Sequence, residues 1–166
     1  MIAAPLPRDE TQRLKALRDL LILDTPPEER FDRIAAFAAQ EFSVPIALVS
    51  LVDRDRQWFK SNFGLEARET PRDISFCGHT ITLSEPLVVP DASEDPRFAD
   101  NPLVTGDPYV RFYAGACLRL PQGQAMGTLC VIDRRPRTFD RLDVAVLCGL
   151  RDLVVEELLR REKVPA

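Results

Sequence analysis

Apolar residues recur at helical spacing near both ends of the chain, and they gather in short runs between those ends. In residues 9–23, Leu14, Leu17 and Leu21 fall on one stripe with Arg13 outside it, which predicts a first helix. A second helix is predicted to follow directly, because Thr25 suits an N-cap.

Pro26 suits the first turn of this second helix, and Glu28 stands three residues after Thr25, as in a capping box. Pro45 marks the exit from the helix. Its buried stripe is expected to contain Phe31, Ile34, Ala35, Ala38 and Phe42.

Apolar runs bounded by turn residues predict strands in the middle of the chain. Ser75 is placed to cap a short helix that ends at Leu83, whereas residues 65–74 are predicted to form a loop. Residues 92–108 are rich in Asp, Pro and Asn, which predicts an irregular segment with at most a turn or two of helix. A last helix is predicted over 140–162, and the strands over 46–53, 56–64, 87–91, 109–120 and 124–133.

Short links join the first two and the last two of these strands, and such hairpins build an antiparallel sheet. Helices from both ends of the chain flank that sheet, so the pattern predicts an α+β fold. With 166 residues, the chain is expected to form a single domain over 1–166.

Composition excludes several classes of function. The net charge of -4 gives no electrostatic reason to expect a nucleic acid or an anionic membrane as partner. The longest apolar runs have the length of a strand, and MIAAPLPRDE lacks the basic and apolar regions of a signal peptide. The expected location is therefore the cytoplasm.

Four cysteines are scattered along the chain without a CxxC pair, and three of them lie in apolar runs. They are expected to be reduced thiols that pack as small apolar groups. A zinc site is not expected, because the chain has a single histidine and no ligand pair at finger spacing.

Five blocks of sequence together resemble the GAF domain family, and specifically the subfamily found at the N-terminus of bacterial histidine kinases and diguanylate cyclases. The resemblance covers about residues 11–159. In chain order, the blocks are LDTPPEERFDRIAAFAA, FCGHTI, LVVPDASEDPRFADNPLV, VRFYAGACL and MGTLCVIDRRPR.

The resemblance implies a sensory domain with an antiparallel sheet of five to six strands, terminal helices on one face and a ligand pocket on the other. The segment 75–108 would roof that pocket. The chain lacks the motif of the cyclic-nucleotide-binding members, and Gly78 separates Cys77 from His79, unlike in the bilin-binding members. The ligand and any cofactor are therefore left unassigned.

Cys77 and His79 are expected to point apart, because residues two apart on a helix diverge by roughly 200°. A Cys–His nucleophile pair is therefore disfavoured. Cys77 is either a reactive thiol in the first turn of a helix or a buried, inert one, and the second reading is preferred. The predicted ligand-binding residues are Phe76, Cys77, His79, Asp91, Phe98, Asn101, Arg111, Tyr113 and Cys117.

The alternation of side chains between the two faces of the strand predicted over 109–120 supports the choice of Arg111, Tyr113 and Cys117 as ligand-binding residues. Tyr109, Arg111, Tyr113 and Cys117 share one strand face, which is assigned to the pocket. The opposite face is small and apolar, so it is expected to meet the terminal helices; it contains Phe112, Ala114, Ala116 and Leu118.

The last helix has two apolar stripes, whereas covering one sheet requires only one. One stripe contains Leu147, Leu150, Val154 and Leu158, and a second contains Leu142, Val146, Gly149 and Leu153. The stripe that does not cover the sheet is expected to meet either the first helix of this chain or a partner copy, which predicts a homodimer through the terminal helices. The expected protein is a non-catalytic sensor of an unidentified small molecule, acting with a kinase or cyclase output domain on another chain. The alternatives are a thiol-based redox enzyme or switch that uses Cys77 with Cys117 or Cys130, and an interaction module without ligand.

Overall fold

A six-stranded antiparallel sheet forms the centre of the computed structural model, which describes residues 1–162. The strand order is β3-β2-β1-β6-β5-β4. The strands are β1 (Ile46–Val52), β2 (Arg56–Phe63), β3 (Glu69–Pro71), β4 (Leu87–Val89), β5 (Phe112–Arg119) and β6 (Ala125–Asp133). The helices are α1 (Glu10–Asp19), α2 (Glu29–Phe42), α3 (Phe76–Thr80), α4 (Pro102–Thr105) and α5 (Arg141–Glu162), with a single 3₁₀ turn, η1, at Ala92–Glu94.

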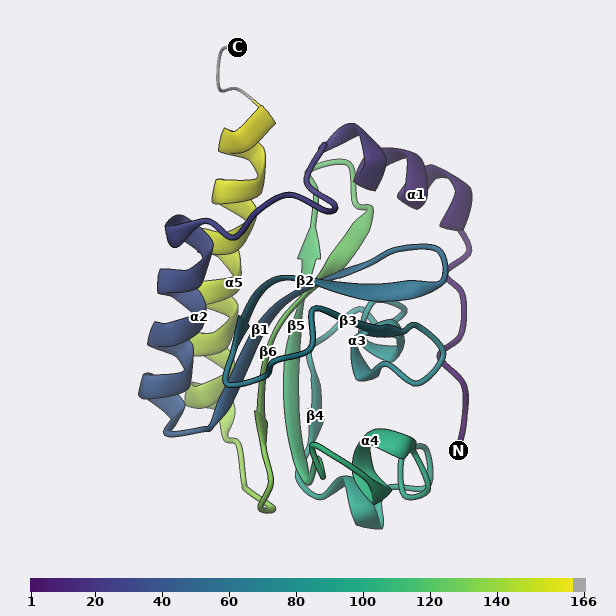
Figure 1. Cartoon of the computed structure of the whole chain (residues 1–166), viewed down its shortest axis with the longest axis vertical. Coiled ribbons are helices and arrows are strands. Elements are labelled where there is room, and N and C mark those ends of the chain that lie inside the picture. Colours follow the sequence, from purple (N-terminus) through teal and green to yellow (C-terminus); the bar gives the residue numbers. More distant parts are fainter. Residues whose placement is uncertain (163–166) are drawn as a thin grey trace.

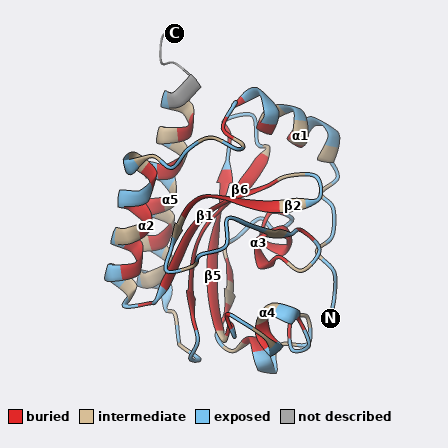
Figure 2. Cartoon of the chain, in the orientation of Figure 1, coloured by how far each residue is buried: buried red, intermediate tan, exposed pale blue. Residues whose placement is uncertain are grey.

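The helices cover the sheet from both sides (Figure 1). The helices α2 and α5 lie side by side on one face, while α3 and α4 lie over the other and α1 crosses one end of the sheet. Burial follows this layering, because the central strands β1, β5 and β6 and the inner sides of α2 and α5 are buried (Figure 2). The predicted α+β fold with terminal helices on one face is confirmed.

Alternation along β5 separates two hydrophobic clusters, as the sequence predicts. The first cluster packs between the sheet and the terminal helices, and β5 contributes Phe112, Ala114, Ala116 and Leu118 to it. The second packs beneath α3 and α4, and β5 contributes Tyr113 and Cys117.

The start of the chain departs from the prediction. The helix α1 ends at Asp19, so Leu21 leaves the apolar stripe and is exposed, while Leu20 and Ile22 are buried in its place. Arg13, expected on the outside, is fully buried.

Arg13 is buried because it joins α1 to two strands. Its guanidinium donates to the carbonyl oxygens of Val52 and Ala125 at 2.7 and 3.1 Å. It also donates to Glu10 at 2.7 Å, and Glu10 in turn pairs with the nearly buried Arg72. Two cations thus share one carboxylate where α1 meets the sheet.

The predicted capping box at Thr25 is wrong. The helix α2 begins at Glu29, and its N-cap position makes no side-chain hydrogen bond. Pro27 accounts for this later start, because a residue that precedes proline avoids the helical region and Pro26 therefore cannot begin the helix. The hydroxyl of Thr25 instead accepts a 2.8 Å hydrogen bond from the buried ammonium of Lys60.

Two further predictions need correction. The predicted loop 65–74 contains the edge strand β3, whose three residues pair with β2 and have no apolar pattern to reveal them. The strand predicted from residue 109 begins at Phe112, because Tyr109 is exposed and has a φ of 59°. Among the described residues, no helix combines the length and hydropathy that a membrane span requires.

Candidate functional site

The space between the sheet and α3, where the ligand pocket is predicted, is almost filled by side chains. A cavity of about 30 Å³ remains, which we call the roof cavity. Cys77, Tyr113 and Cys130 line it together with mostly apolar groups such as Phe59, Phe76 and Val110. A cavity of this size holds a molecule of about the size of water, since a single water needs at least ~10–15 Å³.

Three aromatic rings close the space beside this cavity. The rings of Phe76 and Phe98 stack with their centroids 4.1 Å apart, and the ring of Tyr113 lies 5.1 Å from that of Phe76. All three side chains are buried. Phe76 and Tyr113 therefore line the cavity, while Phe98 packs against Phe76.

Cys77 is the centre of a buried network of polar groups. Its sulfur lies 2.9 Å from Oγ1 of Thr128 and 4.0 Å from the sulfur of Cys130. The hydroxyl of Tyr113 donates to this sulfur at 3.3 Å and lies 2.9 Å from Oγ1 of Thr80. Every polar group of this network thus has a partner inside the protein.

The network sets the acidity of its thiols. Burial alone would raise the pKa of Cys77, but the hydrogen bonds from Cys130, Thr128 and Tyr113 outweigh it and lower the pKa to about 7. The hydrogen bond to Cys77 and burial together raise the pKa of Cys130 well above its ordinary value. A negative charge in this network therefore resides on Cys77.

The cap of α3 has the predicted form, since the hydroxyl of Ser75 accepts from the backbone N–H of Gly78 at 3.0 Å. Cys77 turns toward the sheet, whereas Nε2 of His79 lies 3.1 Å from the carbonyl oxygen of Ile2. The expected divergence of Cys77 and His79 is thus present, and the two do not form a catalytic pair. Burial lowers the pKa of His79, so its imidazole is neutral at neutral pH.

The polar residues predicted in the roof have local structural partners. Asp91 caps the turn η1, and Asn101 caps α4 while donating to the carbonyl oxygen of Ile74. Arg111, which precedes β5, donates to the carbonyl oxygen of Val104 at 2.9 Å. The structure therefore places these three groups away from the roof cavity.

Cys117 lies at a different site from Cys77. It borders a groove of about 450 Å³ between the turn before β4 and α5, where Arg119 and Arg151 contribute the cations. Burial raises the pKa of Cys117 to about 11, so this thiol is protonated at neutral pH.

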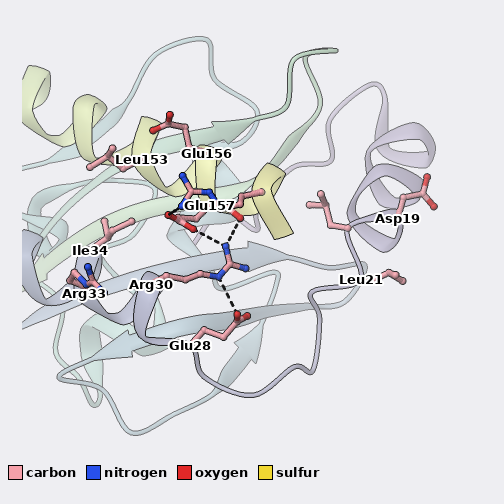
Figure 3. Close-up of a pocket in the computed structure, with 11 residues that line it drawn as sticks. Asp19, Leu21, Glu28, Arg30, Arg33, Ile34, Leu153, Glu156 and Glu157 are labelled. Atoms are coloured by element: carbon pink, nitrogen blue, oxygen red, sulfur yellow. Dashed lines mark hydrogen bonds and ion pairs between the residues drawn. The ribbon is translucent and has the colours of Figure 1, made fainter. Parts of the chain in front are cut away.

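A hollow of about 900 Å³ lies on the helical face between α1, α2 and α5, and we call it the helical groove. At its centre, Arg30 donates to Oε2 of Glu157 at 2.8 Å and to Glu28 at 3.1 Å (Figure 3). Both apolar and charged side chains line the groove: Asp19, Leu20, Leu21, Glu28, Arg30, Arg33, Ile34, Leu153, Glu156, Glu157 and Arg160.

Thr80 and Thr128 are the members of the network that the sequence predictions omitted, and Cys130 was named there only as a possible redox partner of Cys77. The two residues of β6 could have been found by extending the period of two from β5 to β6. That period places Thr128, Cys130 and Ile132 on one face of the strand. The contact with Tyr113 further depends on Gly115, because a β-carbon at that position would overlap the tyrosine hydroxyl.

Comparison with known proteins agrees with the fold. The GAF domain family model matches residues 26–158. A cyclic di-GMP phosphodiesterase of Pseudomonas aeruginosa is 44% identical over 159 residues, which are 95% of this chain. The chain spans 27% of the length of that relative.

Solved structures show the same fold at low identity. The GAF domain of an Acinetobacter phosphoenolpyruvate-protein phosphotransferase has a TM-score of 0.65 and 18% identity, covering 90% of this chain and 94% of that one. A free methionine-R-sulfoxide reductase of Neisseria meningitidis has a TM-score of 0.64 and 17% identity, covering 98% of each chain. The chain thus belongs to the GAF domain family, a family of sensory and regulatory modules in signalling proteins.

Proposed function

We propose that this chain is a cytoplasmic sensory input domain that controls an enzyme of cyclic di-GMP turnover and has no catalytic activity of its own. One observation carries the proposal: 95% of the chain matches a segment that makes up only 27% of a cyclic di-GMP phosphodiesterase. Most of that relative therefore lies outside the matching segment and is free to contain the catalytic domain. The segment itself corresponds to a GAF domain, and the GAF family is regulatory. The output domain is a phosphodiesterase or a cyclase.

Two measurements test this assignment. The isolated chain is expected to leave cyclic di-GMP intact over hours, and hydrolysis would contradict the regulatory role. A chimera is then made in which this chain replaces the matching segment of the Pseudomonas aeruginosa enzyme. The chimera is expected to keep hydrolytic activity, whereas deletion of the segment is expected to change the rate. An unchanged rate of hydrolysis after deletion would contradict the proposal that this segment regulates the enzyme.

We further propose that a small, partly polar molecule binds beneath α3 and α4. Ligand pockets usually measure ~300–1,000 Å³, whereas the roof cavity measures about 30 Å³. Binding therefore requires Phe76 or Phe98 to leave their stack, and the ligand selects that open arrangement by its higher affinity for it. Native mass spectrometry of the purified protein tests this, since a released extra mass identifies the ligand.

A ligand-free interaction module is the second candidate, and the filled pocket favours it. The stacked rings of Phe76 and Phe98, with Tyr113 beside them, occupy the space that a ligand would take. A protein that carries no extra mass, and whose melting temperature no metabolite mixture raises, would favour this candidate over the sensor.

Dimerisation through the helical face is the third part of the proposal. On α5, Leu147 and Val154 belong to a stripe buried in the first cluster, whereas Leu142 and Leu153 are 72% and 46% exposed. The second stripe thus remains uncovered within the chain. The helical groove beside it contains both arginine and carboxylate side chains, so a second copy related by a two-fold axis can place carboxylates of one copy opposite arginines of the other.

Sedimentation equilibrium measures this association. Leu153→Glu is expected to shift the protein toward monomer by placing a charge in the apolar stripe. Leu83→Glu is the matched control, because Leu83 is 37% exposed but lies after α3, away from the helical groove. Dissociation by both variants, or by neither, would refute the proposed interface.

A further inference from the structure

The two buried thiols at the roof cavity have a use that the proposed function does not require. Cys77 on α3 and Cys130 on β6 are separated by 53 residues in sequence, yet their sulfur atoms lie 4.0 Å apart. Both cysteines are free and buried. A disulfide needs a sulfur–sulfur distance of about 2.05 Å, so the pair must close by about 2 Å.

We infer that Cys77 and Cys130 form an oxidisable dithiol, which hydrogen peroxide converts into an intramolecular disulfide linking α3 to β6. The strand β6 is held by β1 and β5 on its two sides, whereas α3 is a helix of five residues resting on the sheet. Closure therefore moves α3 toward the sheet, rather than β6 toward α3.

The hydrogen bonds assign a different role to each sulfur. Cys77 accepts a hydrogen bond from the hydroxyl of Tyr113 at 3.3 Å, which favours its thiolate, and its sulfur lies 4.0 Å from that of Cys130. The titratable groups facing it are Tyr113 on β5 and Cys130 on β6, and the pKa of each is raised. Cys77 is therefore the attacking nucleophile, and Cys130 is the thiol that resolves the intermediate.

The reaction balances with peroxide as the only co-reactant. The Cys77 thiolate attacks one peroxide oxygen, the O–O bond breaks, and the leaving hydroxide takes up a proton to form the first water. Cys77 is then a sulfenic acid. The Cys130 sulfur attacks the Cys77 sulfur, the S–O bond breaks, and the second water leaves with the Cys130 proton. The two thiols lose two electrons and the peroxide gains them.

Access favours a small oxidant. Cys77 and Cys130 both line the roof cavity, whose volume of about 30 Å³ admits a molecule of roughly the size of water. Hydrogen peroxide is of that size, whereas an aromatic hydroperoxide is not. The site is therefore expected to react faster with hydrogen peroxide than with cumene hydroperoxide, and equal rates would refute access through the cavity.

The first experiment uses the reduced wild-type protein. After exposure to hydrogen peroxide, remaining thiols are alkylated in denaturant, and the intact protein and its peptides are weighed. Two of the four cysteines are expected to resist alkylation. The peptides containing Cys77 and Cys130 are expected to be linked, and a dithiol reductant is expected to reverse the link. Four alkylated cysteines, or a link between any other pair, would overturn the inference.

Variants separate the two roles. Cys130→Ser is expected to retain Cys77 as a sulfenic acid that dimedone captures, and Cys77→Ser is expected to leave Cys130 reduced. Cys148→Ser, at a half-buried thiol on α5, is the control and is expected to oxidise like the wild type. The wild-type rate is expected to rise about tenfold from pH 6 to pH 8 with the thiolate fraction. A rate independent of pH, or dimedone capture at Cys130 instead, would overturn the assignment of the nucleophile.

Discussion

Replacing Glu10 tests how α1 is held on the sheet. Its carboxylate binds the buried Arg13 and the nearly buried Arg72, and its side chain is 18% exposed. Burial alone would raise the pKa of Glu10, but the hydrogen bonds from Arg13 and Arg72 outweigh it and lower the pKa from 4.5 to about 2. The neutral Glu10→Gln variant keeps the shape of the side chain and removes this charge.

The contribution of the Glu10 charge to folding stability follows from that pKa. The difference between 4.5 and about 2, at about 1.36 kcal/mol per pH unit, corresponds to about 3 kcal/mol of folding stability. Because the folded protein binds this proton less readily than the unfolded chain, the contribution is complete above pH 4.5 and is lost as the pH falls toward 2. By the same relation, the contribution of Glu10 to folding stability is about 1 kcal/mol at pH 3.

Urea unfolding measures the effect, with the fluorescence of Trp58 as the probe, since it is the one tryptophan in the chain and is buried. The gap in unfolding free energy between wild type and Glu10→Gln is expected to be about 3 kcal/mol at pH 7 and about 1 kcal/mol at pH 3. The two proteins share all other titrating groups, so the change in the gap reports Glu10 alone.

Glu29→Gln is the matched control, because Glu29 is 86% exposed and its nearest charged partner, Arg33, lies 3.8 Å away. Exposed pairs of this kind contribute ~0–1 kcal/mol, so little change is expected at either pH. A gap for Glu10→Gln that stays constant from pH 7 to pH 3 would show that the charge pairing is not what stabilises α1.

Three other substitutions probe the site. Phe98→Ala should cost about 3–5 kcal/mol in urea unfolding and enlarge the roof cavity, which xenon binding would detect; a loss below about 1 kcal/mol would contradict its place in the stack. Gly127→Ala should cost about 4 kcal/mol or more, because a β-carbon there overlaps a backbone carbonyl of β1, and a stable variant would show that the strands can separate. Gly115→Ala should push the Tyr113 hydroxyl off Cys77 and so raise the pKa of Cys77 above about 7, as read from thiolate absorbance, whereas an unchanged pKa would remove Tyr113 from the network.

The sequence was sufficient to predict the elements that depend on side-chain periodicity. The order of helices and strands apart from the edge strand β3, the cap at Ser75 and the two faces of β5 all follow from local patterns, and the structure contains each of them. The failures occur where distant residues compete with a local rule. Thr25 has the residue type of a helix cap, yet the buried Lys60 uses its hydroxyl as an acceptor.

The candidate site was predictable only in part, for the same reason. Cys77 could be identified from its segment, but its partners Thr128 and Cys130 come from β6, and only the pairing of the sheet brings them to α3. Asp91 and Asn101 were chosen as ligand-binding residues by residue type, but the structure uses both as local caps. Their types suit a ligand, but the irregular backbone around them needs those same groups as caps.

The contacts that connect α3 to α1 differ from those that hold α2 and α5 on the sheet. The hydroxyl of Ser75, which caps α3, donates to the carbonyl oxygen of Arg72 at 2.7 Å, and the guanidinium of Arg72 binds Glu10 of α1. The helices α2 and α5 meet the sheet through the apolar side chains of the first cluster, to which Ser61 adds a hydrogen bond to Asp32 and Arg151 a hydrogen bond to the carbonyl oxygen of Cys117. Hydrogen bonds to charged groups are directional and fail over short displacements, whereas apolar contacts tolerate small shifts. We therefore expect a movement of α3 to be felt at α1 through the Arg72–Glu10 pair more strongly than at the apolar contacts of α2 and α5.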